Sequence, residues 1–222
     1  MLKKTYLILF AVLSLQQLTA QNKENRKTIK TTRVDKAPRI DGILDDNAWE
    51  NAELATDFVI FRPDNGKLVS SEYQTIVRVI YNDDAVYISA EMKDPDPEGI
   101  PQEFATRDNF SIADFFLVTI NPNDDGQNPF EFIVQSTGNQ GDSKVSNGRE
   151  DFNWSAVWKS AAKITKTGWN VEMEIPYRAL RFANHPIQSW VFNFPLSSGA
   201  ILIFIGKVFF MHLSLKALFL TI

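Results

Sequence analysis

Two adjacent segments that alternate apolar and polar residues constrain the fold more than any other feature. "YQTIVRVIY" (73–81) is followed by "AVYISAEMK" (85–93), whose apolar members Val86, Ile88, Ala90 and Met92 share one face. A period of two is typical of a strand with one buried face. Residues 82–84, "NDD", favour a turn, so the two segments predict a β-hairpin.

The rest of the central chain repeats short strand patterns separated by turns. We expect strands at 114–121, 130–135, 157–165, 169–175 and 190–194, loops at 94–101, 121–129 and 138–153, and a helical turn at 176–180. Short strands at this spacing are typical of an antiparallel sandwich. The predicted class is all-β, a jelly-roll or immunoglobulin-like β-sandwich with one or two short helical turns, over residues 37–196.

The N-terminal region has a different character. Residues 1–20 place Lys3 and Lys4 before an apolar run at 6–15 and end with the small residue Ala20, which is typical of a secretory signal peptide cleaved before Gln21. An uncleaved membrane anchor is the alternative. Residues 21–36 are polar and basic, and we expect a solvated lead-in, with a segment that binds a polyanion as the alternative. The protein is therefore expected to be exported.

Residues 197–222 form an anomalous apolar tail. Its length suits a membrane helix of roughly 20 residues. However, Lys207, His212 and Lys216 lie within it, and each basic residue near a helix centre costs about 2.5–3.5 kcal/mol on insertion. The last acidic residue of the chain is Glu174. We interpret the tail as the product of a frameshift or truncation, with a membrane-anchoring tail as the alternative.

Composition argues against several functional classes. The 222-residue chain has no Cys, which excludes disulfides, Cys-ligated zinc and a thiol nucleophile. A formal net charge of -4 argues against a nucleic-acid partner. Neither His185 nor His212 belongs to a nucleophile motif, and no HExxH, GxSxG or Gly-rich phosphate loop is present. A glycoside hydrolase with paired carboxylates stays as an alternative, although no spacing selects a pair.

The stretch "APRIDGILDDNAWENA" (37–52) predicts a structural corner. Asp41 and Gly42 favour a sharp bend, and Trp49 lies between alanines on one face of an expected short helix. Asp45 or Asp46 is expected to cap that helix. We interpret Asp41, Gly42 and Trp49 as structural, with ligand stacking by Trp49 as the alternative. Trp169 is assigned a structural role as well.

Aromatic residues cluster in "DFNWSAVW" (151–158). Trp154 and Trp158 would face the same side of a continuous strand. Aromatic faces can stack on sugar rings while polar neighbours bond the hydroxyls, so both residues are candidates for carbohydrate binding. The alternative is that Trp158 packs in the core and Trp154 covers the edge of the sandwich.

A second candidate site is a turn that could hold calcium. Asn121, Asn123 and Asp125 alternate before Gly126, as at the start of a calcium loop. The twelfth position is Phe132 rather than Glu, so an ordinary Asn/Asp/Gly turn is the alternative. We infer no other cofactor.

Four motifs together resemble carbohydrate-binding module family 9, over about residues 29–194. They are "IDGILDDNAW", "YNDDAVYISAEMKDPDP", "DFFLVTINP" and "GWNVEMEIPYRALRF". The chain is most similar to the version found at the N-terminus of large secreted proteins of Gram-negative bacteria, ahead of a domain of unknown function and an outer-membrane barrel. The resemblance implies a non-catalytic module linked to glycan breakdown, periplasmic, outer-membrane-associated or extracellular.

The sugar clamp of that family does not carry over to this sequence. Its first stacking Trp corresponds to Ser111, its Glu to Leu117 and its Arg to Ile133, and its second stacking Trp would lie beyond Phe194. The resemblance thus implies the fold but not the family's own sugar site, so glycan binding would need a different site. We assign that site to Arg107, Phe110, Trp154 and Trp158. A structural or interaction domain that has lost sugar binding is the alternative function.

Overall fold

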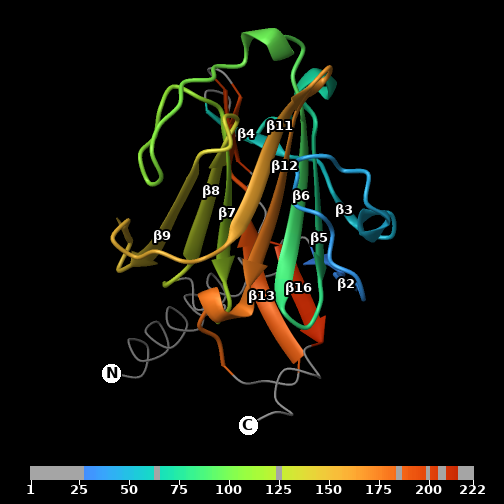
Figure 1. Ribbon diagram of the computed structural model, residues 1–222, viewed down its shortest axis with the longest axis vertical. Coiled ribbons are helices and arrows are strands. Elements are labelled where there is room, and N and C mark those ends of the chain that lie inside the picture. The colour runs from blue at the N-terminus through green and yellow to red at the C-terminus, as the bar shows by residue number, and fades with distance from the viewer. Residues whose placement is uncertain are drawn as a thin grey trace, which may run out of the picture.

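The computed structural model describes residues 28–62, 66–123, 127–183, 187–198, 201–204 and 209–214. This part of the chain forms two packed β-sheets, one of ten strands and one of six (Figure 1). Its helical elements are 3₁₀ turns: η1 (Asn47–Trp49), η2 (Ser71–Tyr73), η3 (Pro97–Gly99) and η4 (Tyr177–Ala179). The predicted all-β sandwich is confirmed.

The six-stranded sheet is built around the two predicted hairpins. The first consists of β5 (Thr75–Tyr81) and β6 (Ala85–Lys93), and the second of β11 (Lys159–Thr165) and β12 (Gly168–Pro176). Strand β12 pairs antiparallel with β6, which gives the order β11-β12-β6-β5. Two short strands, β2 (Thr32–Arg33) and β3 (Leu54–Ala55), pair with β5 at the edge.

The ten-stranded sheet is centred on β7 (Phe115–Asn121). On one side follow β8 (Phe130–Gln135), β9 (Gln140–Ser146) and β10 (Arg149–Asp151). On the other side β13 (Ile187–Asn193) and β14 (Leu196–Ser198) both pair with β7. Beyond them lie β16 (Phe209–Ser214) with β1 (Thr28–Ile29), and β15 (Ile201–Phe204) with β4 (Val59–Arg62).

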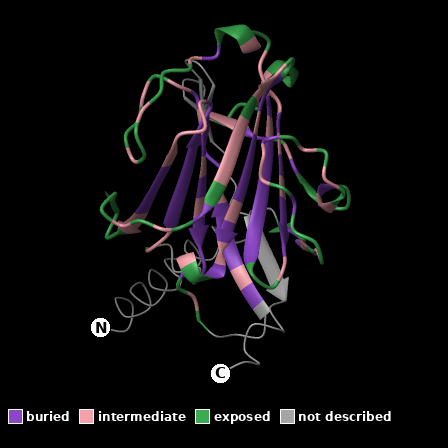
Figure 2. Cartoon of the chain, in the orientation of Figure 1, coloured by how far each residue is buried: buried purple, intermediate pink, exposed green. Residues whose placement is uncertain are grey.

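The main core lies between the two sheets. The face of β6 predicted to be apolar supplies Val86, Ile88, Ala90 and Met92 to it. Trp169 is 1% exposed and belongs to the same core. Figure 2 shows that most strands are buried, that β11 is largely intermediate, and that exposed residues gather mainly in the loops. Fully burying one large apolar side chain contributes about 1.5–3 kcal/mol.

Two segments that were predicted to lie outside the sheets contain strands. Residues 138–153 were predicted to be a loop but contain β9 and β10. The polar residues Asp142 and Ser143 of β9 are fully buried and bonded to distant side chains, which local periodicity does not reveal. In the expected lead-in, residues 28–29 and 32–33 pair with the sheets, and Ile29 is buried.

The corner at residues 37–52 also differs in detail. Trp49 is 3% exposed, but it lies in a second, smaller cluster with Ile80 and Tyr87 rather than in the main core. The capping prediction was wrong, since the carboxylate of Asp46 accepts a hydrogen bond from the backbone N–H of Arg39 (2.9 Å) and caps nothing. The turn is a 3₁₀ turn of three residues.

The ends of the chain are described only in part. The predicted signal peptide, residues 1–20, lies outside the described residues, as do parts of the tail. Within residues 197–222, β15 and β16 pair with β4 and β13, so the backbone of the tail takes a place in the sheet. Its origin by frameshift or truncation stays a prediction. None of the helices in the described part has the length and apolarity needed to cross a membrane.

Candidate functional site

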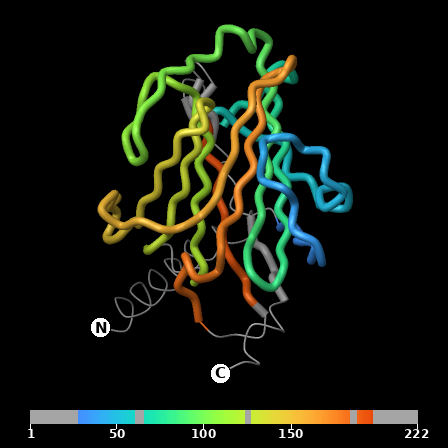
Figure 3. The backbone as a smooth tube through the Cα atoms, in the orientation of Figure 1, coloured from blue at the N-terminus to red at the C-terminus, as the bar shows by residue number. Residues whose placement is uncertain are grey.

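A hollow of about 360 Å³ lies on the outer face of the ten-stranded sheet. Its floor comes from alternate residues of β7 and β8, which face the same side of the sheet because side chains alternate along a strand. Its rim comes from β10 and from the long loop between β6 and β7, which Figure 3 traces in green across one end of the molecule. The lining residues are Phe110, Ser111, Ala113, Phe115, Leu117, Glu131, Ile133, Gln135, Glu150 and Phe152.

Two exposed aromatic rings form one wall of this hollow. Phe110 is 50% exposed and Phe152 is 37% exposed. Their ring centroids lie 5.7 Å apart in an edge-to-face arrangement, a favoured geometry for aromatic pairs. Phe110 lies over Gly141, where an added Cβ would come within 3.0 Å of its ring. The glycine therefore makes room for Phe110 at this position.

Two carboxylates supply hydrogen-bond acceptors. Glu131 is 9% exposed, and its Oε2 accepts a hydrogen bond from the hydroxyl of Ser143 (2.6 Å). Burial raises the pKa of Glu131, repulsion from Glu150 raises it further, and the Ser143 bond opposes the shift. In the described part of the chain, Oε1 of Glu131 accepts no hydrogen bond. That oxygen and the exposed Glu150 can accept from ligand hydroxyls.

An amide network holds the rim loop against β8. The Nε2 of Gln135 donates to the carbonyl of Ser111 (3.2 Å), and its Oε1 accepts from the Nδ2 of Asn139 (3.1 Å). Asn139 also donates to the carbonyl of Asn109 (2.8 Å). Because Gln135 is only 2% exposed, its own two bonds are partly shielded from water, whereas the bond from Asn139 to Asn109 is exposed. They fix the loop that carries Phe110.

Of the four predicted glycan-binding residues, Phe110 alone lines this hollow. The guanidinium of Arg107 is bonded to the Asp142 carboxylate, to the Oε1 of Gln140 (2.6 Å) and to the carbonyl of Ala156 (3.0 Å). These bonds brace two loops against β9. The four residues therefore do not converge on one site.

The two predicted tryptophans lie on the inner side of the sheet. Trp158 is 5% exposed, and its ring packs edge-on against Phe132 at 5.2 Å. Such burial leaves no ring face for a sugar, so its assignment as a ligand residue is not supported and the packing alternative describes it. Trp154 is half-buried and covers Phe130 at a centroid distance of 5.2 Å.

The three positions that correspond to the family's sugar clamp do meet in the hollow. Ser111, Leu117 and Ile133 all line it, and Leu117 lies directly opposite Ile133 in the strand register. The clamp residues are absent, but Phe152 and Glu131 occupy the same surroundings. Sequence reasoning missed Glu131, although its alternation with Phe130 and Phe132 indicates that it faces away from the core.

The calcium prediction stays a prediction. No group of three or more His, Cys, Asp or Glu side chains able to hold a metal ion occurs in the part that the structure describes. The Oδ1 of Asn121 accepts from the backbone N–H of Asn123 (3.2 Å), as in an Asx turn. Asp125, the charged member of the predicted set, lies outside the described residues.

Comparison with solved structures supports the fold. A family 9 carbohydrate-binding module from Caldicellulosiruptor kristjanssonii in complex with glucose aligns with a TM-score of 0.55 and 17% identity, covering 81% of this chain and 85% of its own. Its cellotriose complex gives 0.57 and 16%, covering 83% and 93%. A candidate carbohydrate-binding protein from Bacteroides uniformis gives 0.61 and 12%, covering 84% and 99%.

The family assignment comes from sequence comparison. No match was found among curated proteins. The family model for "Carbohydrate family 9 binding domain-like" matches residues 40–194, which is more than half of the chain. The chain therefore belongs to the family of carbohydrate family 9 binding domain-like proteins.

Proposed function

We propose that this chain is a non-catalytic carbohydrate-binding domain that takes a neutral sugar in the hollow on β7 and β8. The observation that carries the proposal is the exposed ring pair Phe110–Phe152 beside the unused carboxylate oxygen of Glu131. Ligand sites typically combine an apolar, concave surface with a few directed polar groups. This hollow has that composition.

The chemistry of a pyranose suits these surroundings. Its C–H face can pack on the ring of Phe110 or Phe152, and its hydroxyls can donate to Glu131 and Glu150. A hydrogen bond to an ionised acceptor is stronger than one between neutral groups. The apolar side chains of Leu117 and Ile133 exclude water from the floor. Solved family 9 modules hold glucose and cellotriose, so these two sugars are the first ligands to test.

The wider context belongs to the same proposal. The pattern of residues 1–20 and the family resemblance support export and a place as the N-terminal module of a larger envelope protein linked to polysaccharide breakdown. Mass spectrometry of the protein from its source cells tests the export step. A mature chain that begins at Gln21 supports export with a cleaved signal peptide, and a chain that retains Met1 contradicts cleavage and favours the uncleaved membrane anchor.

Calorimetric titration of the purified chain with glucose and cellotriose, after a glycan array, tests the binding site. Phe110→Ala and Phe152→Ala should each weaken binding at least about tenfold, about 1.4 kcal/mol, because each removes part of the aromatic wall. Leu68→Ala is the matched control, since Leu68 is 63% exposed and lies outside the hollow. Circular dichroism should show the same fold for all three variants.

Two results would overturn the proposal. Absence of binding to any glycan at millimolar concentration would favour the alternative, a structural or interaction domain that has lost sugar binding. Binding that survives both Phe110→Ala and Phe152→Ala would place the sugar elsewhere.

A further inference from the structure

A second hollow, of about 440 Å³, lies at the edge of the sandwich on the opposite face of β8 and β9 from the first. Phe130 of β8 and Lys144 of β9 line it. Their sequence neighbours point to the other side of the sheet, where Glu131 lines the first hollow and Ser143 bonds to Glu131. Its other walls come from residues 154–157 and from η4 with the residues after it. We call it the basic groove.

Three basic side chains define the groove, and none of its lining residues is acidic. Lys144, Arg178 and Arg181 come from two separate parts of the chain. None of them forms an ion pair within the described residues, whereas Arg33, Arg39, Arg107 and Lys159 each pair with a carboxylate.

The nearest acid along the strand register does not neutralise the groove. Asp151 lies opposite Lys144 in the pairing of β10 with β9. Its carboxylate accepts from the backbone N–H and the side-chain amide of Asn153, both at 3.0 Å, and forms no ion pair with Lys144. Unpaired cations lining a hollow raise the local concentration of anions. This concentration of positive charge stands out on a chain whose formal net charge is -4.

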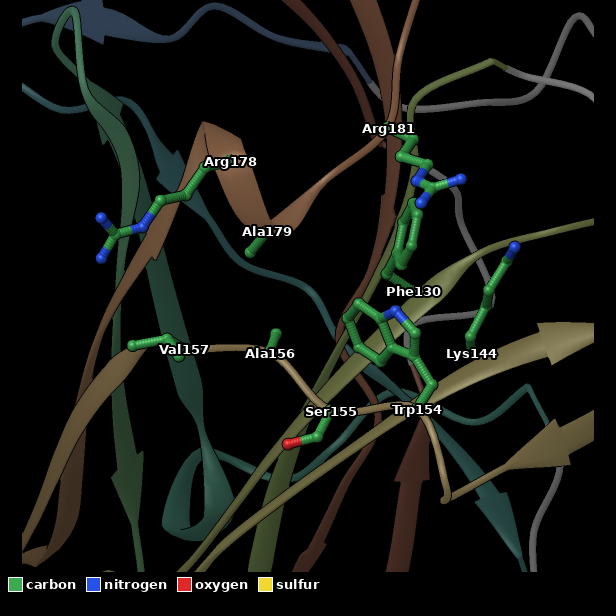
Figure 4. Close-up of a pocket in the computed structure, with 9 residues that line it drawn as sticks. All are labelled: Phe130, Lys144, Trp154, Ser155, Ala156, Val157, Arg178, Ala179 and Arg181. Atoms are coloured by element: carbon green, nitrogen blue, oxygen red, sulfur yellow. The ribbon is translucent and has the colours of Figure 1, made fainter.

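The groove also has an apolar side. Trp154 is half-buried against Phe130, and Val157 is 75% exposed. Figure 4 shows Arg178 with Val157 toward one end of the groove, and Arg181 with Lys144 toward the other, near Trp154. Positive charge therefore stands at both ends of an apolar surface.

The walls of the groove are held in place by the rest of the fold. The buried carboxylate of Asp142 accepts from the backbone N–H of Ala156 (2.6 Å), which fixes the segment that carries Trp154. The hydroxyl of Tyr177 donates to the carbonyl of Asn82 (3.0 Å), which fixes η4. A site whose walls are ordered before binding loses less entropy when a ligand arrives.

We propose that the basic groove binds an oligosaccharide whose sugar residues carry carboxylates, that is, an oligouronate of two or more residues. The apolar C–H face of a sugar ring would pack on Trp154 and Val157, and carboxylates on successive rings would meet the cations at the two ends. Arg guanidinium groups bind carboxylates through two parallel hydrogen bonds. A small inorganic anion would use the cations but not the apolar surface between them.

Titration with an oligogalacturonate trimer, in parallel with the fully methyl-esterified trimer, tests the proposal. The ester keeps the rings and removes the charges, so it should bind at least about tenfold more weakly. The Arg178→Gln/Arg181→Gln double variant and Lys144→Gln should each weaken binding of the trimer by a similar factor. Lys166→Gln removes one charge from an exposed turn outside the groove and should change nothing. Raising the salt concentration should weaken binding, since salt screens exposed charges.

Further experiments test whether the trimer binds in the basic groove rather than in the first hollow, and whether other anions bind there equally well. Phe110→Ala should leave trimer binding intact, and glucose or cellotriose should not displace the trimer. Equal binding of the ester, or full displacement by inorganic phosphate at the same concentration as the trimer, overturns the proposal. Loss of trimer binding in Phe110→Ala also overturns it, because the acidic sugar would then occupy the first hollow. The basic groove stands or falls independently of neutral-sugar binding.

Discussion

Each sheet carries a buried glutamate on the face turned away from the main core, and the two carboxylates have different partners. Glu172 of β12 accepts three N–H groups, from the backbone of Asp41 (3.0 Å) and Gly42 (2.8 Å) and from the indole of Trp49 (3.0 Å). Glu131 of β8 accepts one hydroxyl, that of Ser143. Burial raises the pKa of both groups.

These different partners reflect a difference between the two sheets: the outer face of the six-stranded sheet is covered by the chain itself, and the outer face of the ten-stranded sheet is left open. Over the six-stranded sheet, the corner at residues 37–52 places Trp49 on Ile80 and Tyr87 and uses the acceptors of Glu172. Over the ten-stranded sheet, no segment of the described chain covers Glu131 in this way, and two aromatic rings stay exposed. Bonds supplied by the chain itself indicate a structural role, whereas an unused acceptor beside exposed rings indicates a ligand.

The largest expected effect is the loss of the corner. Trp49→Ala should lower the free energy of unfolding by about 3–5 kcal/mol, because it empties a buried site and leaves Glu172 without one donor. Phe110→Ala, on the open face, should change it by less than about 1 kcal/mol. Urea denaturation measures both. Similar losses for the two variants would contradict the assigned difference between the faces.

A smaller effect is expected from replacing each glutamate by its isosteric amide. Glu172→Gln should lower the free energy of unfolding by about 1–3 kcal/mol, because one of the three N–H donors would lose its acceptor in a buried setting. Glu131→Gln keeps an oxygen for Ser143 and should be nearly neutral for stability, while weakening sugar binding. Equal destabilisation by both variants, measured in the same urea titrations, would show that Glu131 is structural too.

Much of the fold could be predicted from local sequence patterns. The elements that were missed depend on contacts between residues far apart in the sequence. The hairpins were predictable because alternation and turn residues lie within about twenty residues of each other. Strand β9 was missed because Asp142 and Ser143 are buried through bonds to Arg107 and Glu131, which a local pattern cannot show. The bend at Gly42 was predictable, and its positive φ of 80° agrees with the glycine there.

The candidate site was predictable in part for the same reason. The resemblance placed Ser111, Leu117 and Ile133 at the clamp positions, and the structure brings all three into one hollow. The contact between Phe110 and Phe152 forms because the loop between β6 and β7 approaches the end of β10 in the folded chain. The spacing of residues in the sequence does not reveal this approach. Likewise, the bond from Trp49 to Glu172 spans 123 residues. The sequence predicts the buried Trp and leaves its partner unspecified.

The smallest and most discriminating effect is on pH dependence. Because burial raises the folded-state pKa of Glu172 and Glu131 above 4.5, the ordinary value, the folded chain binds these protons more tightly than the unfolded chain. Their contribution to stability is therefore fully present below about pH 4.5 and is lost as the pH rises through the raised pKa. Urea titrations between about pH 4 and 7.5 should show a shallower fall in each Gln variant than in the wild type.

The pH dependence of sugar binding should distinguish Glu131 from Glu172. Sugar hydroxyls that donate to Glu131 favour its ionised form, so affinity for a neutral sugar should rise as the pH rises through the pKa of Glu131. Glu131→Gln should flatten that rise, and Glu172→Gln should leave it unchanged, because Glu172 is fully buried under the corner. The exposed carboxylate of Glu150 lines the same hollow, so Glu150→Gln is the matched variant that isolates its share of sugar binding. A rise in affinity that persists in Glu131→Gln but disappears in Glu172→Gln would reverse the roles assigned to the two faces.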